Sequence, residues 1–203
     1  MDSNKLIRFA GWSAYVNVIA NIIGFVSLFV FFAVGGPAGI INDSSSVFFS
    51  LSLIPLALAW YQLHRSLFPS LSLAVTIIGI LGMLIAAILQ ALLVFGLVEF
   101  EQTLQTVLIA NAIIGVWLIG NGLLAQRSAI LPQGLAWIAI LAGIGLVLII
   151  VGFWIGGETQ PLTAIGGLVA FLGILSWAIW FGRLLLANPV RSFDKSHPME
   201  KDV

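Results

Sequence analysis

The sequence predicts an all-α protein, a polytopic transmembrane bundle of six helices whose two termini both lie in the cytoplasm. Three observations lead to this prediction. Of the 203 residues, 61% are hydrophobic and only 8% are charged, whereas a soluble domain carries about 25% charged residues. Six stretches each reach the roughly 20 apolar residues that a membrane-spanning helix needs. When the chain crosses the membrane once at each of these stretches, all eight Lys and Arg residues fall on the same side of the membrane.

The composition also excludes several classes of protein. The formal net charge is zero and the chain has no cysteine. A neutral chain gives no indication of a nucleic-acid partner. The lack of cysteine excludes disulfides, thiolate metal sites and a cysteine nucleophile. Because no soluble core could bury so large an apolar fraction, the lipid bilayer is the predicted partner of most of the surface.

The six predicted spans are residues 9–34, 47–63, 71–98, 104–124, 135–155 and 162–186. Backbone polar groups in hydrocarbon must be hydrogen-bonded within their own segment, so each span is expected to be a helix. The first apolar stretch exceeds the roughly 7–15 residues of a signal-peptide core, which favours a retained span. The second span is the least regular, because it contains Ser50, Ser52 and Pro55. Residues 188–203 are predicted to form a polar cytoplasmic tail.

The positions of the cations orient the bundle. In the loops on one side of the membrane, every charged residue is acidic, namely Asp43, Glu99, Glu101 and Glu158. The opposite side carries all the cations, namely Lys5, Arg8, Arg65, Arg127, Arg183, Arg191, Lys195 and Lys201. Lys and Arg concentrate in cytoplasmic loops, and an arginine at a span end can reach the headgroups. The predicted topology anchors are therefore Arg8, Arg65, Arg127 and Arg183.

Aromatic residues follow the same polarity. Trp and Tyr prefer the membrane interface, and most of them lie toward the predicted cytoplasmic ends of the spans: Trp12, Tyr15, Trp60, Tyr61, Trp137, Trp177 and Trp180. We expect these rings at the headgroups. Only Trp117 falls near the middle of a span, where its indole N–H would need a partner.

One stretch resembles a known family. The string "IIGVWLIGNGLLAQRSAILPQGLAWIAILAGIG" has a Gly-rich span, a basic residue, Ser, an apolar pair, Pro and a second Gly-rich span; the matching residues are Gly120, Gly122, Leu123, Arg127, Ser128, Ile130, Leu131, Pro132, Gly134 and Gly143. Over residues 110–145 it resembles the domain-of-unknown-function 4386 family of bacterial and archaeal membrane proteins. The resemblance implies six spans and a prokaryotic inner or plasma membrane, and it implies no activity.

The spans contain almost no ionisable side chain, although such residues are the usual functional sites within membranes. Their scarcity argues against a proton relay, a voltage sensor or an ion-coupled transporter. The candidate interior residues are instead uncharged: Asn17, Asn21, Gln90, Asn111, Trp117 and Asn121. Amides of this kind either hydrogen-bond neighbouring helices together or line a cavity for a small neutral or amphipathic ligand. In both cases they face the bundle interior.

Three functions remain open. The leading hypothesis is a non-enzymatic membrane protein that acts through its transmembrane surface, as a partner subunit or as a binder of lipid-like ligands. The first alternative is a channel or facilitator for a small neutral solute. The second is an intramembrane enzyme acting on lipid, with His64, Tyr61 and Arg65 at the cytoplasmic rim. No cofactor or metal site is indicated. The motif "GFWIG" at residues 152–156 fits either a homo-oligomer face or, preferably, packing within the bundle.

Overall fold

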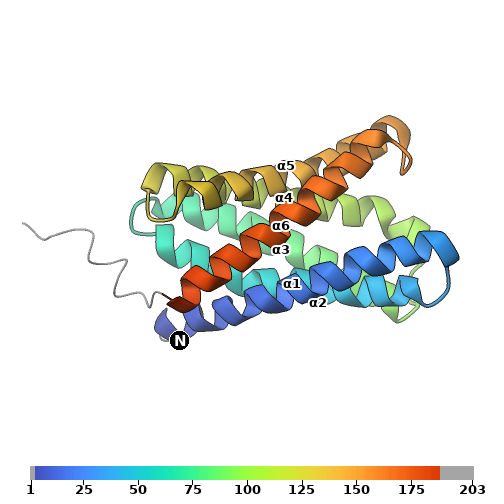
Figure 1. Ribbon diagram of the computed structural model, residues 1–203, viewed down its shortest axis with the longest axis horizontal. Helices are drawn as coiled ribbons and strands as arrows, with labels where there is room; N and C mark the ends of the chain where they lie inside the picture. The colour runs from blue at the N-terminus through green and yellow to red at the C-terminus, as the bar shows by residue number, and fades with distance from the viewer. Residues whose placement is uncertain (1–2, 188–203) are drawn as a thin grey trace, which may run out of the picture.

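The computed structural model describes residues 3–187, and all its regular elements within that range are helices (Figure 1). Each predicted span corresponds to one helix. The helices are α1 (Ser3–Val34), α2 (Ala38–His64), α3 (Pro69–Val94), α4 (Phe100–Ser128), α5 (Gln133–Gly156) and α6 (Pro161–Ala187). The predicted tail, residues 188–203, lies outside the described residues.

The helices form a closed ring in chain order. Each helix packs against its neighbours in the sequence, and α6 packs against α1 to complete the ring. Short connections make consecutive helices antiparallel, so α1 begins at the same end of the bundle at which α6 ends (Figure 1). We call this the terminal end, and the opposite end, with the α1–α2, α3–α4 and α5–α6 connections, the distal end. Across the ring, the backbones of α2 and α4 also approach each other.

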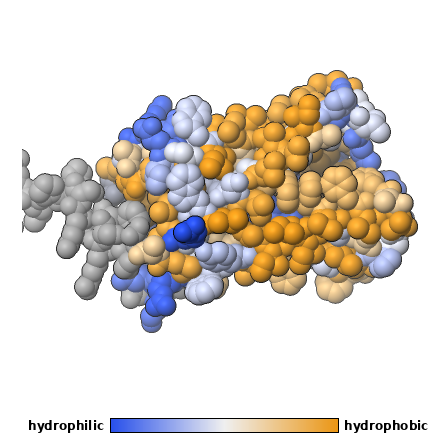
Figure 2. Space-filling view, in the orientation of Figure 1, coloured by the Kyte–Doolittle hydropathy of each residue, from blue (hydrophilic) through white to orange (hydrophobic). Residues whose placement is uncertain are grey.

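The surface has the polarity of a membrane protein. All six helices are long and apolar enough to span a bilayer, and a broad hydrophobic surface separates hydrophilic groups at the two ends (Figure 2). Large apolar side chains such as Phe29, Ile88 and Leu172 are exposed on it. The predicted anchors Arg8, Arg65, Arg127 and Arg183 are exposed at the terminal end. The fold is that of a multi-pass integral membrane protein.

Several helix boundaries differ from the predicted spans, and the largest shift is at the start of α2. Helix α2 begins at Ala38 rather than at residue 47, so the polar stretch "INDSSS" is helical and not a loop. Helix α3 ends at Val94, before the predicted limit of 98, because Gly96 adopts a left-handed φ of 65°. The N–H of Leu97 donates to the carbonyl of Leu92 and the N–H of Gly96 to that of Leu93. This is the glycine-terminated helix end that satisfies the last free carbonyls.

Glycines allow the helices of the ring to approach closely. A Cβ added at Gly115 of α4 would lie 2.6 Å from the carbonyl oxygen of Gly143 in α5. One added at Gly152 of α5 would lie 2.5 Å from the backbone N of Thr163 in α6. Small residues are used in this way wherever membrane helices pack tightly. Gly152, the first glycine of "GFWIG", therefore serves packing within the bundle.

Two of the tryptophans predicted near the cytoplasmic ends of the spans, Trp60 and Trp177, do not face outward. Both indoles are fully buried, whereas Trp12, Trp137 and Trp180 are exposed as expected. Position along a span gives the depth of a residue but not the direction in which its side chain points. Trp60 and Trp177 face the interior of the ring.

Candidate functional site

The axis of the ring is filled by aromatic side chains in its terminal half. Trp177 of α6 lies 5.7 Å from Trp60 of α2 and 5.9 Å from Trp117 of α4, measured between ring centroids. Phe181 packs on both Trp60 and Trp177. We call Trp60, Trp117, Trp177 and Phe181, all fully buried, the aromatic cluster. Because α2, α4 and α6 alternate around the ring, only such large side chains can span the space between them.

His64 belongs to the edge of this cluster. Its ring is fully buried and stacks on Trp60 at 5.7 Å between centroids. Its Nδ1 lies 3.0 Å from the carbonyl oxygen of Trp60, which makes Nδ1 the donor of that hydrogen bond. Its Nε2 is buried and has no partner among the described residues. The histidine is thus packed into the core of the bundle rather than displayed at its rim.

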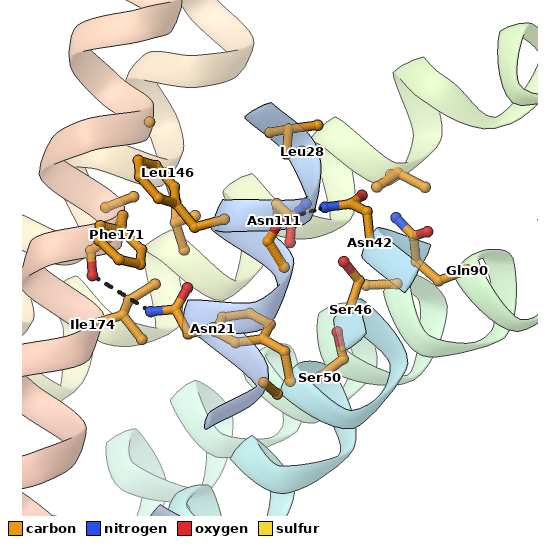
Figure 3. Close-up of a pocket in the computed structure, with 18 of the residues that line it drawn as sticks. Asn21, Leu28, Asn42, Ser46, Ser50, Gln90, Asn111, Leu146, Phe171 and Ile174 are labelled. Atoms are coloured by element: carbon orange, nitrogen blue, oxygen red, sulfur yellow. Dashed lines mark hydrogen bonds between the residues drawn. The ribbon is translucent and has the colours of Figure 1, made fainter. Parts of the chain in front are cut away.

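The distal half of the axis holds a cavity instead. Its volume is about 240 Å³, and all six helices contribute to its lining (Figure 3). The polar side chains come from α1 to α4: Asn21, Asn42, Ser46, Ser50, Gln90 and Asn111. Every lining residue from α5 and α6 is apolar or a glycine: Leu146, Ile149, Gly167, Ala170, Phe171 and Ile174. The cavity therefore has one polar and one apolar wall, and none of the described residues that line it is charged.

Two of the lining amides are held by backbone carbonyls. Asn21 donates to the carbonyl of Phe171 at 3.4 Å, and Asn42 donates to that of Gly24 at 2.9 Å. These bonds tie α1 to α6 and α2 to α1 at the level of the cavity. They leave the carbonyl oxygens of both amides free to accept a hydrogen bond.

The other polar groups of the cavity are unpaired within the described chain. No hydrogen bond from a described residue reaches the side chains of Ser46, Ser50 or Asn111. The Oε1 atom of Gln90 is buried without a partner. A buried polar group without a hydrogen bond costs about 1–3 kcal/mol. The cavity is therefore a place where a polar molecule would be stabilised.

The floor of the cavity is a layer of close-packed side chains. One turn nearer the terminal end, the helices contribute Leu53, Met83, Ile114 and Trp177, each no more than 2% exposed. Trp177 also belongs to the aromatic cluster. Toward the terminal end this layer is followed by Trp60, Trp117 and Phe181 of the same cluster.

The predicted interior residues fall into two groups. Asn21, Gln90 and Asn111 line the cavity. Asn17 lies one turn deeper and donates to Ser52 Oγ and to the carbonyl of Phe49, both at 3.0 Å. Its role is to join α1 to α2.

The remaining two predicted residues lie toward the terminal end. Trp117 is part of the aromatic cluster, and Asn121 follows it one turn later on α4. Both are buried, and neither the indole N–H of Trp117 nor the amide of Asn121 has a partner among the described residues. They do not line the cavity. The set of interior residues predicted from the sequence therefore contains residues from two separate places on the axis.

Three cavity residues were missed by the sequence analysis, namely Asn42, Ser46 and Ser50. The signal was present, because these residues recur every four positions and so share one face of a helix. It was hidden because Asn42 and Ser46 were assigned to a loop, which left Ser50 as an isolated polar residue of the second span.

Comparisons with known proteins identify no relative. No family model, no curated protein and no solved structure matches this chain. The resemblance of residues 110–145 to the domain-of-unknown-function 4386 family therefore stays a prediction. Within residues 3–187 no group of three or more His, Asp or Glu side chains is placed to hold a metal ion.

Proposed function

We propose that this chain is a non-enzymatic membrane protein that binds a small, uncharged, partly apolar ligand in the distal cavity. The observation that carries the proposal is the pairing of two walls across one cavity. Ser46, Ser50, Gln90 and Asn111 offer unpaired hydrogen-bonding groups, and the side chains of α5 and α6 opposite them offer only apolar surface. Ligand sites in proteins combine an apolar lining with a few converging polar groups in this manner.

The size and charge of the cavity limit what it binds. Its volume of about 240 Å³ would hold about eight water molecules at roughly 30 Å³ each. The absence of charge among its described lining residues disfavours ions, because an unpaired charge is costly in a low-dielectric site. A ligand of this size with hydroxyl or amide groups fits both limits.

The close-packed floor favours binding over conduction. A facilitator for a neutral solute needs a path through the whole bundle, and the layer of Leu53, Met83, Ile114 and Trp177 lies across it. Likewise, burial of His64 beneath Trp60 does not favour a role for its ring in an enzyme acting on lipid at the rim. A role as a partner subunit stays a prediction.

The proposal includes an orientation. The terminal end would face the cytoplasm, because Arg8, Arg65, Arg127 and Arg183 gather there and cytoplasmic loops are enriched in Arg and Lys. The cavity would then lie in the outer half of a prokaryotic plasma membrane. Reporter tags fused to the two ends should both report the cytoplasm, and a tag that reports the opposite compartment contradicts this orientation.

The ligand can be sought by purification from native membranes. We expect wild-type protein in mild detergent to retain a small molecule that mass spectrometry detects after extraction. Asn111→Leu keeps the side-chain volume and removes the amide, so retention should fall by about tenfold, within the range of one lost buried hydrogen bond. Gln105→Leu is the matched control, because Gln105 is exposed on the same helix.

Two outcomes would contradict the proposal. One is wild-type protein that carries no small molecule above the level of a similarly purified unrelated membrane protein. The other is equal retention by Asn111→Leu, Gln90→Leu and wild type.

A further inference from the structure

The seam between α1 and α6 is tight near the terminal end and opens toward the distal end. Near the terminal end, a Cβ added at Gly182 would lie 2.7 Å from the Cβ of Ala14. Toward the distal end the two helices diverge, and Figure 1 shows α6 crossing α1 obliquely and moving away from it. The last ring contact across the seam is the stack of Phe25 on Phe171, with centroids 3.8 Å apart.

The cavity reaches the surface through the divergent part of this seam. Leu28 of α1 and Gly167 of α6 both line the cavity distal to the Phe25–Phe171 stack. Leu28 is 37% exposed, and a Cβ added at Gly167 would meet no atom within 4 Å. In Figure 2 the surface is hollowed between α1 and α6, and hydrophilic groups are visible inside the hollow.

The rim of this opening is apolar and lies in the hydrophobic surface of the bundle. The neighbouring residues Phe29 and Ile165 are each more than half exposed. Such side chains face lipid chains in a membrane-embedded bundle, so the opening leads to the bilayer rather than directly to water. The polar wall of Ser46, Ser50, Gln90 and Asn111 lies behind it.

We propose that the gap between α1 and α6 is a lateral portal, through which the cavity takes the uncharged head of a single-chain amphiphile from the bilayer. The head, carrying hydroxyl or amide groups, pairs with Ser46, Ser50, Gln90 and Asn111, and the chain leaves between Leu28 and Gly167 into the membrane. This inference rests on the proposed binding function and adds to it the class of ligand and its route.

The chemistry of the two walls excludes a charged head. A carboxylate or phosphate would find no cation among the described lining residues, and it would lose its hydration on leaving the interface. The volume of about 240 Å³ holds a head of glycerol size together with the start of one chain, and not a complete two-chain phospholipid.

The test uses a long-chain monoacylglycerol with a photoreactive group near the head, incorporated into liposomes with the full-length protein. We expect saturable adducts on α1 near Leu28 and on α6 near Phe171, located by peptide mass spectrometry. Unlabelled monoacylglycerol should compete. The fatty acid of equal length, ionised at neutral pH, should compete about tenfold less well because its charge must be desolvated. Glycerol alone should not compete.

The portal itself is tested by closing it. Gly167→Trp places a large side chain in the gap, and we expect saturable labelling to fall at least about tenfold, the loss expected when a site is sterically blocked. Leu168→Trp is the matched control, because Leu168 is 51% exposed on the same helix and does not line the cavity. Its labelling should equal that of wild type.

A second variant keeps the test decisive if Gly167→Trp fails to fold. The chain contains no cysteine, so Gly167→Cys introduces a single thiol that a bulky maleimide can modify after purification. Modification should abolish saturable labelling, whereas the same treatment of Leu168→Cys should not. Undiminished labelling after modification at position 167 overturns the portal.

The results also separate this inference from the proposed function. If glycerol competes as well as the long-chain probe, and Asn111→Leu still loses the native ligand, then the binding function stands and the lateral route is wrong. If the probe does not label the wild type saturably and no native ligand is retained, both proposals fail.

Discussion

The two halves of the ring's axis are built by the same six helices, and they differ in the spacing of α1 and α6 and in what fills the axis. In the terminal half, Trp60, Trp117, Trp177 and Phe181 meet across the axis and are fully buried. In the distal half, the corresponding positions on the same helices carry side chains such as Ser46, Ser50 and Asn111, and a cavity of about 240 Å³ remains. A six-helix ring leaves space at its centre, and side-chain size together with the divergence of α1 and α6 leaves that space open in the distal half. The first half therefore stabilises the fold, and the second is free to bind.

The largest expected effect is on the packed half. Trp177→Ala removes the ring that contacts Trp60, Trp117 and Phe181, and we expect it to lower the free energy of unfolding by about 3–5 kcal/mol. Trp180→Ala, on the same helix and 37% exposed, should cost far less. Thermal unfolding in detergent, followed by circular dichroism, measures both. Similar losses for the two variants would show that the aromatic cluster does not hold the bundle together.

A smaller effect should distinguish the closed seams from the open one. A methyl group at Gly143 would collide with the carbonyl oxygen of Gly115 and approach Ile119, so Gly143→Ala should destabilise by about 1–3 kcal/mol. Gly167 has open space around it. Gly167→Ala should therefore be neutral, or stabilising by up to about 1 kcal/mol through helix propensity. The same unfolding assay checks the pair, and destabilisation at both positions would contradict an open seam.

Polar residues that join helices should affect stability more than polar residues that line the cavity. Asn17 bridges α1 to α2 through two hydrogen bonds of 3.0 Å, and interhelical bonds in membranes contribute about 0.6 kcal/mol on average and up to about 1.7 kcal/mol. Asn17→Ala should cost an amount in this range. Ser50→Ala, one turn away in the cavity wall, should leave stability unchanged because its hydroxyl bonds to no described residue. A larger loss for Ser50→Ala in ligand-free protein would assign the cavity serines to structure.

The smallest expected effect is a gain in the free energy of unfolding rather than a loss. Gln90→Leu replaces a buried, unpaired amide oxygen by an apolar side chain of similar volume, so ligand-free protein should gain up to about 1 kcal/mol. The same variant should lose ligand retention. Unfolding of delipidated samples and mass spectrometry of native samples measure the two changes. A variant that loses both stability and ligand would indicate that Gln90 supports the fold.

The sequence predicts the number and class of the helices because length and hydropathy alone determine both. It does not predict which way a side chain points, since these helices are apolar on nearly every face and carry little periodic signal. The positions of Trp60 and Trp177 near the span ends therefore gave no indication that both rings are buried inside the ring. The cavity was predicted only in part, through Asn21, Gln90 and Asn111. Asn42 and Ser46 were missed because a polar helix start resembles a loop until the space that it faces is known, and Ser50 was missed because it then stood alone on its helix face.

The most direct test of the account is a density map of the full-length protein in lipid nanodiscs prepared from native membranes. The account predicts elongated density that passes between Leu28 and Gly167, reaches Gln90 and Asn111, and ends above Trp177. A collapsed cavity with α1 and α6 in contact along their whole length would contradict it, and so would density that continues along the axis through the aromatic cluster.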